Sequence, residues 1–358
     1  MTIRVFSRSD LIVMIGGVVA VAAAGIMHYG GAAAVLAFVV AGAAVALLAS
    51  LVGRSVEQLG DRFGPGATGV LQSALGNLPE LFIGFFALKA GLIAVVQAAI
   101  IGSILSNILL VLGLAFVVGG LRHGTQRFDS DRARTSTVLM VLATGALVMP
   151  SLAAYVHTPA EPHERVLSIV VSVVLLGVFL LSLPSALRRT TEPAAAEPAA
   201  AGHEGPHWPL WLAVTMLTAA SVAAALVSDW FVSALEPAID ALGVSQAFAG
   251  LVIVAIAGNA IENVVGIQLA YRNRADFALS VIIQSPLQVA LVLAPVLVLL
   301  SLFTATTLTL VFAPLLVMAV AITVLATAFI VFDGESTWLE GVTLIALYAI
   351  IATTFWWG

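Results

Sequence analysis

The chain has 358 residues, of which 61% are hydrophobic and only 9% are charged, and its formal net charge at pH 7 is -5. Soluble domains carry about 25% charged residues, so this chain has too few charges to cover a surface in water, and we expect a polytopic membrane protein. The absence of cysteine excludes disulfides, thiolate catalysis and cysteine-ligated metal sites.

Apolar runs that cross a bilayer need about 20 residues each, and we expect eleven such runs in this chain. The first follows Arg4 and Arg8, and no cleavage pattern comes after it, so it is interpreted as a retained helix and not as a signal peptide. Lipid offers no partners to open backbone groups, so all the runs are expected to be helical. The expected spans lie near 11–28, 31–53, 66–88, 91–119, 135–155, 166–184, 208–228, 245–270, 276–302, 306–332 and 338–357.

An Ala/Pro/Glu-rich stretch around residues 184–209 cannot build a core and divides the spans six and five. We therefore expect four parts: an extra N-terminal helix (1–30), a first five-helix repeat (31–187), a cytoplasmic linker (188–207) and a second five-helix repeat (208–358). With the N-terminus inside, this topology leaves only Lys89 and Arg165, of 14 basic residues, on the outer side. The positive-inside rule then predicts that the N-terminus and residues 185–207 are cytoplasmic and that the C-terminus is outside.

Two related motifs support the repeat. "GNLPE" at 76–80 recurs as "GNAIE" at 258–262, and we call the shift that carries Gly76 onto Gly258 the repeat offset. The same shift carries Ser103 onto Ser285 and Ser106 onto Gln288 without a gap. Because each motif lies in a unit of five spans, the second unit is inverted relative to the first. The predicted fold is an all-α polytopic membrane protein of about 11 transmembrane helices, with one extra helix and two inverted five-helix repeats.

Glu80 and Glu262 are the charged residues that this topology places well inside spans. A charge at the bilayer centre costs about 2.5–3.5 kcal/mol, and intramembrane carboxylates are functional by default. A protonated structural glutamate is the alternative for either residue alone. Two glutamates at equivalent positions of an inverted repeat favour a shared site at the bilayer midplane.

The residues expected near the glutamates carry oxygen donors, which suit Ca²⁺. Two amides precede the glutamates by three residues, and hydroxyl and amide groups follow on the neighbouring helices; these residues are Asn77, Asn259, Ser103, Ser285, Ser106, Asn107 and Gln288. Four further residues can interrupt helices and free backbone carbonyls, namely Gly76, Pro79, Gly258 and Pro286. Two buried carboxylates must be neutralised by one cation or by protons, which suggests an exchanger.

At these motifs the chain resembles the calcium/cation antiporter superfamily, and within it the cation/proton exchanger family. The resemblance implies that Glu80 and Glu262 bind Ca²⁺ and protons alternately, and that amide and hydroxyl residues complete the site: Asn77, Asn259, Ser103, Ser285 and Gln288. It further implies a transporter and not an enzyme, without a cofactor, whose partners are Ca²⁺, protons and the lipid bilayer and not nucleic acid. The Ala-rich composition suits a bacterial plasma membrane.

Other functions stay open at this point. The L-P-E of the first motif is reminiscent of sodium/calcium exchangers, so Na⁺/Ca²⁺ or other cation exchange is the alternative. Those relatives look richer in hydroxyls before each glutamate, and they carry a further acidic or amide residue on the next helix of each repeat, where this chain has Asn107 and the apolar Val289. A channel and an intramembrane enzyme fit the repeat and the donor set less well.

Overall fold

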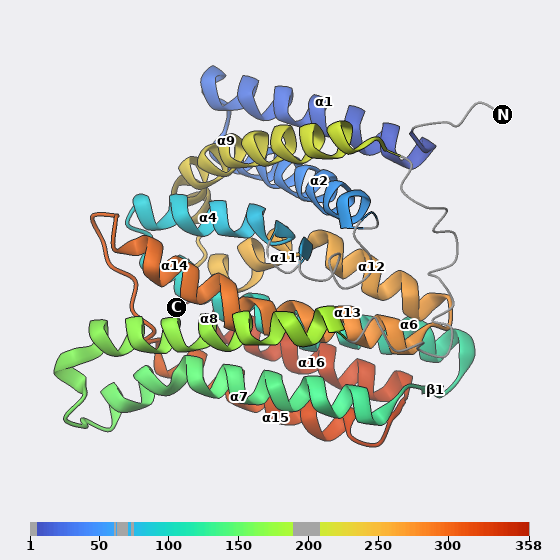
Figure 1. Cartoon of the computed structure of the whole chain (residues 1–358). Helices are drawn as coiled ribbons and strands as arrows, with labels where there is room; N and C mark the ends of the chain where they lie inside the picture. Colours follow the sequence, from blue (N-terminus) through green and yellow to red (C-terminus); the bar gives the residue numbers. More distant parts are fainter. Residues whose placement is uncertain (1–5, 61, 63–70, 73–74, 189–207, 358) are drawn as a thin grey trace. The chain divides into compact units, whose positions relative to one another are not determined.

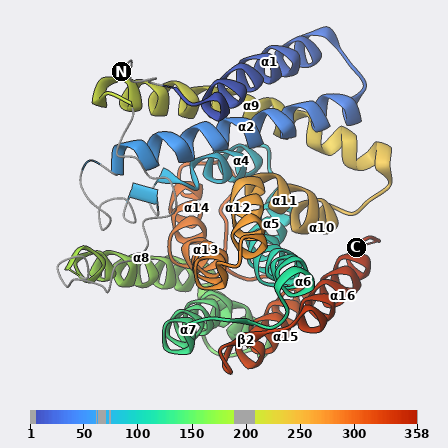
Figure 2. The same cartoon turned by 90° about the vertical axis from the view of Figure 1, so that its right-hand side faces the viewer.

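The computed structural model describes residues 6–60, 62, 71–72, 75–188 and 208–357 (Figures 1 and 2). Nearly all of them are helical, and the strands among them are the short antiparallel pair β1 (Gln126–Arg127) and β2 (Glu335–Ser336). The chain divides into two compact units. One comprises Met1–Phe86 with Gly177–Leu242, and the other comprises Ala87–Leu176 with Gly243–Gly358.

Within the described ranges, eight helices are long and apolar enough to cross a membrane. A ninth span results if the pair Gln246–Gly258 and Asn263–Tyr271, bent by 62°, is counted as one, and the apolar helix Trp338–Thr354 is shorter. The expected span 66–88 lies partly outside the described residues, and its described part includes the 12-residue helix α4 (Leu78–Lys89). The total of eleven therefore stays a prediction, and residues 189–207 of the linker lie outside the described part of the chain.

The first unit contains α1 (Arg8–Gly30), α2 (Ala34–Gly60) and α9 (Leu210–Leu242), which lie side by side in both views (Figures 1 and 2). Phe38 of α2 stacks on Phe231 of α9 with ring centroids 4.5 Å apart. The predicted span 208–228 ended too early, because α9 continues through Pro237 for 33 residues in all. This extension contains the acidic residues Asp229, Glu236 and Asp240. All three are exposed, so continuing the helix through them buries no charge.

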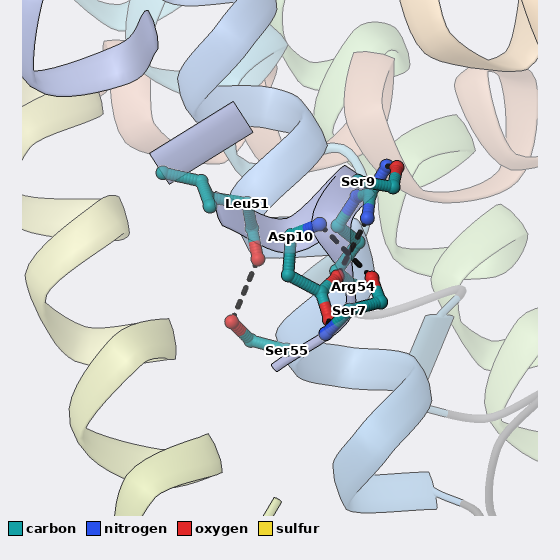
Figure 3. Close-up of polar contacts among 6 residues, drawn as sticks. All are labelled: Ser7, Ser9, Asp10, Leu51, Arg54 and Ser55. Atoms are coloured by element: carbon teal, nitrogen blue, oxygen red, sulfur yellow. Dashed lines mark hydrogen bonds and ion pairs between the residues drawn. The ribbon is translucent and has the colours of Figure 1, made fainter. Parts of the chain in front are cut away.

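The extra helix α1 is tied to α2 by a polar cluster (Figure 3). Ser7 and Asp10 form a capping box at the start of α1, which satisfies backbone N–H groups that have no partner within the helix. The Arg54 guanidinium of α2 donates to Asp10 Oδ1 at 2.6 Å and to Ser9 Oγ at 2.7 Å. The predicted cytoplasmic end of α1 is therefore held to α2 by an ion pair and a hydrogen bond.

The second unit contains the helices that follow α4 and most of the second predicted repeat. Its elements are α5 (Ile93–Leu105), α6 (Leu112–His123), α7 (Ser130–Tyr155), the 3₁₀ turn η2 (Glu161–His163), α10 (Gln246–Phe248), α11 (Ala255–Gly258), α12 (Ala260–Tyr271), α13 (Ala275–Gln288), α14 (Ala294–Ser301), α15 (Pro314–Val331) and α16 (Trp338–Thr354). The helix α8 (Glu164–Arg188) begins in this unit and ends in the other. Within the second unit, α7 lies beside α15, and α6 lies beside α16.

Three π-helical segments interrupt this unit: the first contains Ser106 and Asn107, the second ends four residues before Gly258, and the third directly follows Gln288. They are η1 (Ser106–Val111), η3 (Ala249–Val254) and η4 (Val289–Leu293). Extra residues in a helical turn widen it and often mark functional sites. Nothing in the sequence pattern signalled them.

The repeat offset also relates elements of the structure. It carries α4 (Leu78–Lys89) onto α12 (Ala260–Tyr271), and it carries the first residue of α6, Leu112, onto the first residue of α14, Ala294. The correspondence therefore extends beyond the motifs to the bounds of helices.

Glycines allow two helix crossings in the second unit to be very close. A Cβ atom on Gly102 of α5 would lie 2.2 Å from the carbonyl oxygen of Leu251, and one on Gly250 of η3 would lie 2.3 Å from that of Val95. Gly113 of α6 and Gly341 of α16 meet in the same way. Small residues at such crossings let backbones approach, which is the main source of packing between membrane helices.

Candidate cation-binding site

The second motif interrupts a helix. The short helix α11 ends at Gly258, Asn259 leaves helical geometry with φ −94° and ψ 15°, and α12 begins at Ala260. The two parts differ in direction by 62°. Glu262 is the third residue of α12, in its first turn. Its backbone is thus placed at the positive end of the helix dipole, which favours a carboxylate. The side chain of Glu262 lies outside the described part of the structure.

The first motif has the same form. Gly76 and Asn77 occupy a turn, and α4 begins at Leu78, so Pro79 lies in the first helical turn, where a missing N–H breaks no bond. Pro79 is buried, and Glu80 follows it as the third residue of α4. A Cβ atom on Gly76 would lie 2.5 Å from the carbonyl oxygen of Gln72, so this turn requires glycine. Each glutamate is therefore the third residue of a helix that begins directly after the asparagine of its motif.

A buried polar network surrounds Asn259 in the second unit. The Asn259 amide donates to Ser103 Oγ at 3.1 Å and to the carbonyl of Ala255 at 3.0 Å. The Asn259 Oδ1 atom accepts from Asn107 Nδ2 at 3.1 Å and from Ser285 Oγ at 3.0 Å. Four elements thus meet at one amide: α5, η1, α13 and the break before α12. The network is inside the protein, since Asn107 and Asn259 are 0% exposed.

The network leaves one amide oxygen uncommitted. Asn107 Nδ2 also donates to the carbonyl of Ser103 at 2.8 Å, so both amide groups have orientations fixed by their donors. Asn259 Oδ1 already accepts two hydrogen bonds. Asn107 Oδ1 is buried and has no hydrogen-bond partner among the described residues. A cation or a protonated carboxyl at this place would satisfy Asn107 Oδ1 directly, whereas it would reach Asn259 Oδ1 only by displacing a donor.

The structure brings together five predicted residues from the network and its border. Ser103, Ser285, Asn107 and Asn259 form the network, and Ser106 Oγ donates to the carbonyl of Ser103 at 3.3 Å. Gln288 is also buried, at the end of α13.

The remaining predicted residues fall elsewhere. Asn77 and Glu80 belong to the other compact unit. Pro286 was expected to interrupt a helix, but it lies inside α13, which continues to Gln288 and passes directly into η4. The widened turn of η4 takes up the missing N–H within a continuous span. Among the described residues, no group of three or more histidine, aspartate or glutamate side chains could hold a metal ion.

Replacing Asn259 by alanine should disrupt the whole network, because Ser103, Asn107 and Ser285 would each lose their bond to it. A buried donor that loses its acceptor costs about 1–3 kcal/mol, and Ser285 Oγ loses Asn259 Oδ1, so we expect activity to fall by at least about tenfold. The measurement is the rate of ion transport in liposomes. The control is Ser172→Ala, which removes a buried hydroxyl that donates within its own helix. Equal rates in both variants would contradict the prediction.

Comparisons with known proteins identify the family of the chain. The family model described as sodium/calcium exchanger protein matches residues 33–186 and 212–357. The chain is 36% identical over 350 residues to a Ca(2+)/H(+) antiporter of Synechocystis sp., with 92% of each chain covered. It is 35% identical over 354 residues to the Ca(2+)/H(+) antiporter ChaA of Bacillus subtilis, covering 98% of this chain and 99% of the relative. The solved structure of native YfkE superimposes with a TM-score of 0.81 at 33% identity, covering 96% of this chain and 99% of that one. The chain therefore belongs to the sodium/calcium exchanger protein family.

Proposed function

We propose that this protein exchanges Ca²⁺ for protons across a membrane by alternating access. The observation that carries the proposal is the buried network of amide and hydroxyl groups around Asn259, in a chain at least 35% identical to two proteins named as Ca(2+)/H(+) antiporters. Amide, hydroxyl and carboxylate oxygens are the ligands that Ca²⁺ prefers. Proteins with this donor set and a helix break in each motif fit the midplane sites of inverted-repeat transporters.

In the proposed mechanism Glu80 and Glu262 supply the charge and the amides supply neutral ligands. With Ca²⁺ bound, both glutamates are carboxylates, and with Ca²⁺ absent, both take up protons, so the site is neutral in either state. The helix N-termini at Leu78 and Ala260 place a partial positive charge near each glutamate. A bare, doubly charged site is too costly to cross the membrane interior, which couples the two ion fluxes.

Asn107 Oδ1 is the proposed first amide ligand, because it is buried and without a hydrogen-bond partner among the described residues. Asn259 then has the role of orienting Ser103, Asn107 and Ser285 around the ion. The proposal also includes two five-helix repeats of opposite orientation, the extra helix and the cytoplasmic linker. It places the protein in the plasma membrane with a cytoplasmic N-terminus.

Sodium coupling is the second candidate, because the matching family model is described as sodium/calcium exchanger protein. The repeat offset carries Asn107 onto Val289. At these positions the first repeat offers an amide oxygen and the second an apolar side chain, which argues against sodium coupling. Fewer oxygen ligands make a poorer cage for additional Na⁺ ions.

The test uses the purified protein in sealed liposomes and follows Ca²⁺ uptake. We expect uptake in sodium-free buffer that requires an imposed pH gradient and stops when an ionophore collapses the gradient. Uptake that requires a Na⁺ gradient instead would establish the sodium alternative. Uptake that requires neither gradient would indicate a channel, and it would refute exchange altogether.

A further inference from the structure

The C-terminal end of α12 is held by one side chain at the end of α6 and one just after it. The last carbonyls of a helix have no partners within it. Gln126 Nε2 donates to the carbonyl of Ala270 at 3.2 Å and to Asn273 Oδ1 at 3.2 Å, and the His123 ring donates to the carbonyl of Tyr271 at 2.9 Å. We call Gln126 and His123 the α12 clamp. It fastens the far end of the helix that begins with Glu262.

Gln126 occupies a closely fitted position. It is 3% exposed, and its Oε1 atom lies over Gly119, where an added Cβ would come within 1.8 Å of it. Its partner Asn273 has a φ of 59°, a left-handed conformation that asparagine adopts more readily than most residues. The contact therefore depends on a glutamine at 126, a glycine at 119 and an asparagine at 273. A hydrogen bond formed by chance on the surface has no such requirement.

The segment that carries the α12 clamp is bonded to elements other than α12. Directly after Gln126, the Arg127 side chain pairs with Glu335 at 3.0 Å, the Phe128 N–H donates to the carbonyl of Gly334 at 2.9 Å, and the Asp129 N–H donates to Asp276 Oδ1 at 2.5 Å. The loop between α6 and α7 is thus fixed to the start of α13 and to the connection between α15 and α16.

The helix that begins with Glu80 has a corresponding contact. Thr306 Oγ1, in the connection between α14 and α15, donates to the carbonyl of Leu88 at 2.9 Å. We call this contact the α4 clamp. The repeat offset carries Leu88 onto Ala270, so the same carbonyl of each motif helix is bound. It also carries the loop 124–130 onto 306–312, so the donors come from equivalent connections, although Gln126 and Thr306 differ by two positions in register.

The base of the α4 clamp is also fixed by side chains. Gln97 Nε2 donates to the carbonyls of Thr309 and Val311 at 3.0 and 2.9 Å. Ser151 Oγ donates to the carbonyl of Leu310 and accepts from the Phe312 N–H, both at 2.9 Å. The segment from residue 308 to residue 312 is therefore held in place as an extended strap by α5 and α7.

Each predicted repeat supplies the connection that holds the motif helix of the other repeat. The loop that holds α12, from the second repeat, belongs to the first repeat, and the connection that holds α4, from the first repeat, belongs to the second. We propose that Gln126 and Thr306 are positioning residues of two clamps, which set the balance between the two access states by holding the far ends of the glutamate-bearing helices. This inference rests on the proposed exchange by alternating access.

The clamps act on the difference in free energy between the two access states. Ala270 is eight residues beyond Glu262, about 12 Å along a helix, so a change of tilt that moves Glu262 must also strain or release the clamp at the other end. A hydrogen bond that is made in one access state and lost in the other stabilises the first state. Both hydrogen bonds are made in the same structure, so both clamps favour the access state that this structure represents.

The test compares Gln126→Met, which keeps the shape over Gly119 but removes both hydrogen bonds, with Thr306→Val, which removes one hydroxyl. The control is Gln268→Met, the same substitution at an exposed position of α12. Ca²⁺ half-saturation is measured at each membrane face, in right-side-out and everted vesicles at equal pH. A single hydrogen bond between membrane helices is worth a factor of about three.

We expect Gln126→Met to raise half-saturation at one face and lower it at the other by about threefold, and Thr306→Val to change both values in the same directions. A purely structural role would lower the maximal rate and leave both half-saturation values unchanged. That result, or changes of opposite sign in the two variants, would overturn the proposal.

A second measurement separates the clamps from the proposed function. Hydrogen exchange of the Arg272, Asn273 and Arg274 amides, which bond to carbonyls near the end of α12, is expected to be faster in Gln126→Met than in Gln268→Met. If the wild-type protein shows no Ca²⁺ exchange, the proposed function fails, and the amide exchange alone tests the clamp. Unchanged amide exchange in Gln126→Met would overturn the clamp itself.

Discussion

Replacing both Glu80 and Glu262 by glutamine is expected to abolish proton-driven Ca²⁺ uptake. Glutamine keeps the size and an oxygen ligand but removes the negative charge and the site of protonation. A hydrogen bond to a charged group is worth about 1.5–3 kcal/mol, so loss of both carboxylates should lower transport by at least about a hundredfold. The measurement is Ca²⁺ uptake and coupled proton release in the same liposomes.

The single variants sharpen this test. Each is expected to lose transport almost completely, because one remaining carboxylate leaves the Ca²⁺ site with a net positive charge. The control is Glu236→Gln, at an exposed position of α9 in the first unit, which should transport like the wild type. Calcium-driven proton movement retained in the double variant would contradict both the exchanger mechanism and the role of these two residues.

Replacing Gly102 by alanine is expected to separate α5 from η3 and dismantle the polar network. The added methyl group would lie 2.2 Å from the Leu251 carbonyl oxygen and 2.5 Å from its Cα, both backbone atoms, so no side chain can move aside. Overpacking of this kind costs about 1–3 kcal/mol. Ser103 is the next residue and would move away from Asn259, so we expect lower thermal stability in detergent together with lost transport.

Gly145→Ala provides the matched control, because Gly145 lies on the membrane helix α7 and an added Cβ there has no heavy atom within 4 Å. Alanine favours helix more than glycine does by about 1 kcal/mol, so this variant should be as stable as the wild type or slightly more stable. Equal melting temperatures for Gly102→Ala and Gly145→Ala would show that the close crossing is not required.

Much of the architecture follows from local properties that a sequence displays. A run of apolar residues must be helical in lipid, and this rule predicted helices where α1, α2, α5 with α6, α13 with α14, and α15 are found. The paired motifs indicated the family, because glycine, asparagine and glutamate at fixed spacing are rare in apolar segments. The helix interruption at Asn259 follows from the same motif.

Other features depend on contacts between segments far apart in the chain. The π-helical segments are widened turns whose geometry depends on packing, and Pro286 is accommodated inside α13 for this reason. The choice between Asn259 and Asn107 as the uncommitted amide depends on which donors surround each one. No spacing rule could find those donors, because Ser103 and Asn259 are 156 residues apart.

The sequence by itself determined that this is a helical membrane protein with two related motifs, the residue types of its site and its family. These follow from hydropathy and from the cost of charges and helix breaks in lipid, which act residue by residue. Only the tertiary structure decided that Gly102 and Gly250 bring α5 against η3, and that Gln126 reaches the end of α12. Such contacts arise when distant helices pack, and their partners are fixed by three-dimensional shape, which no local pattern encodes.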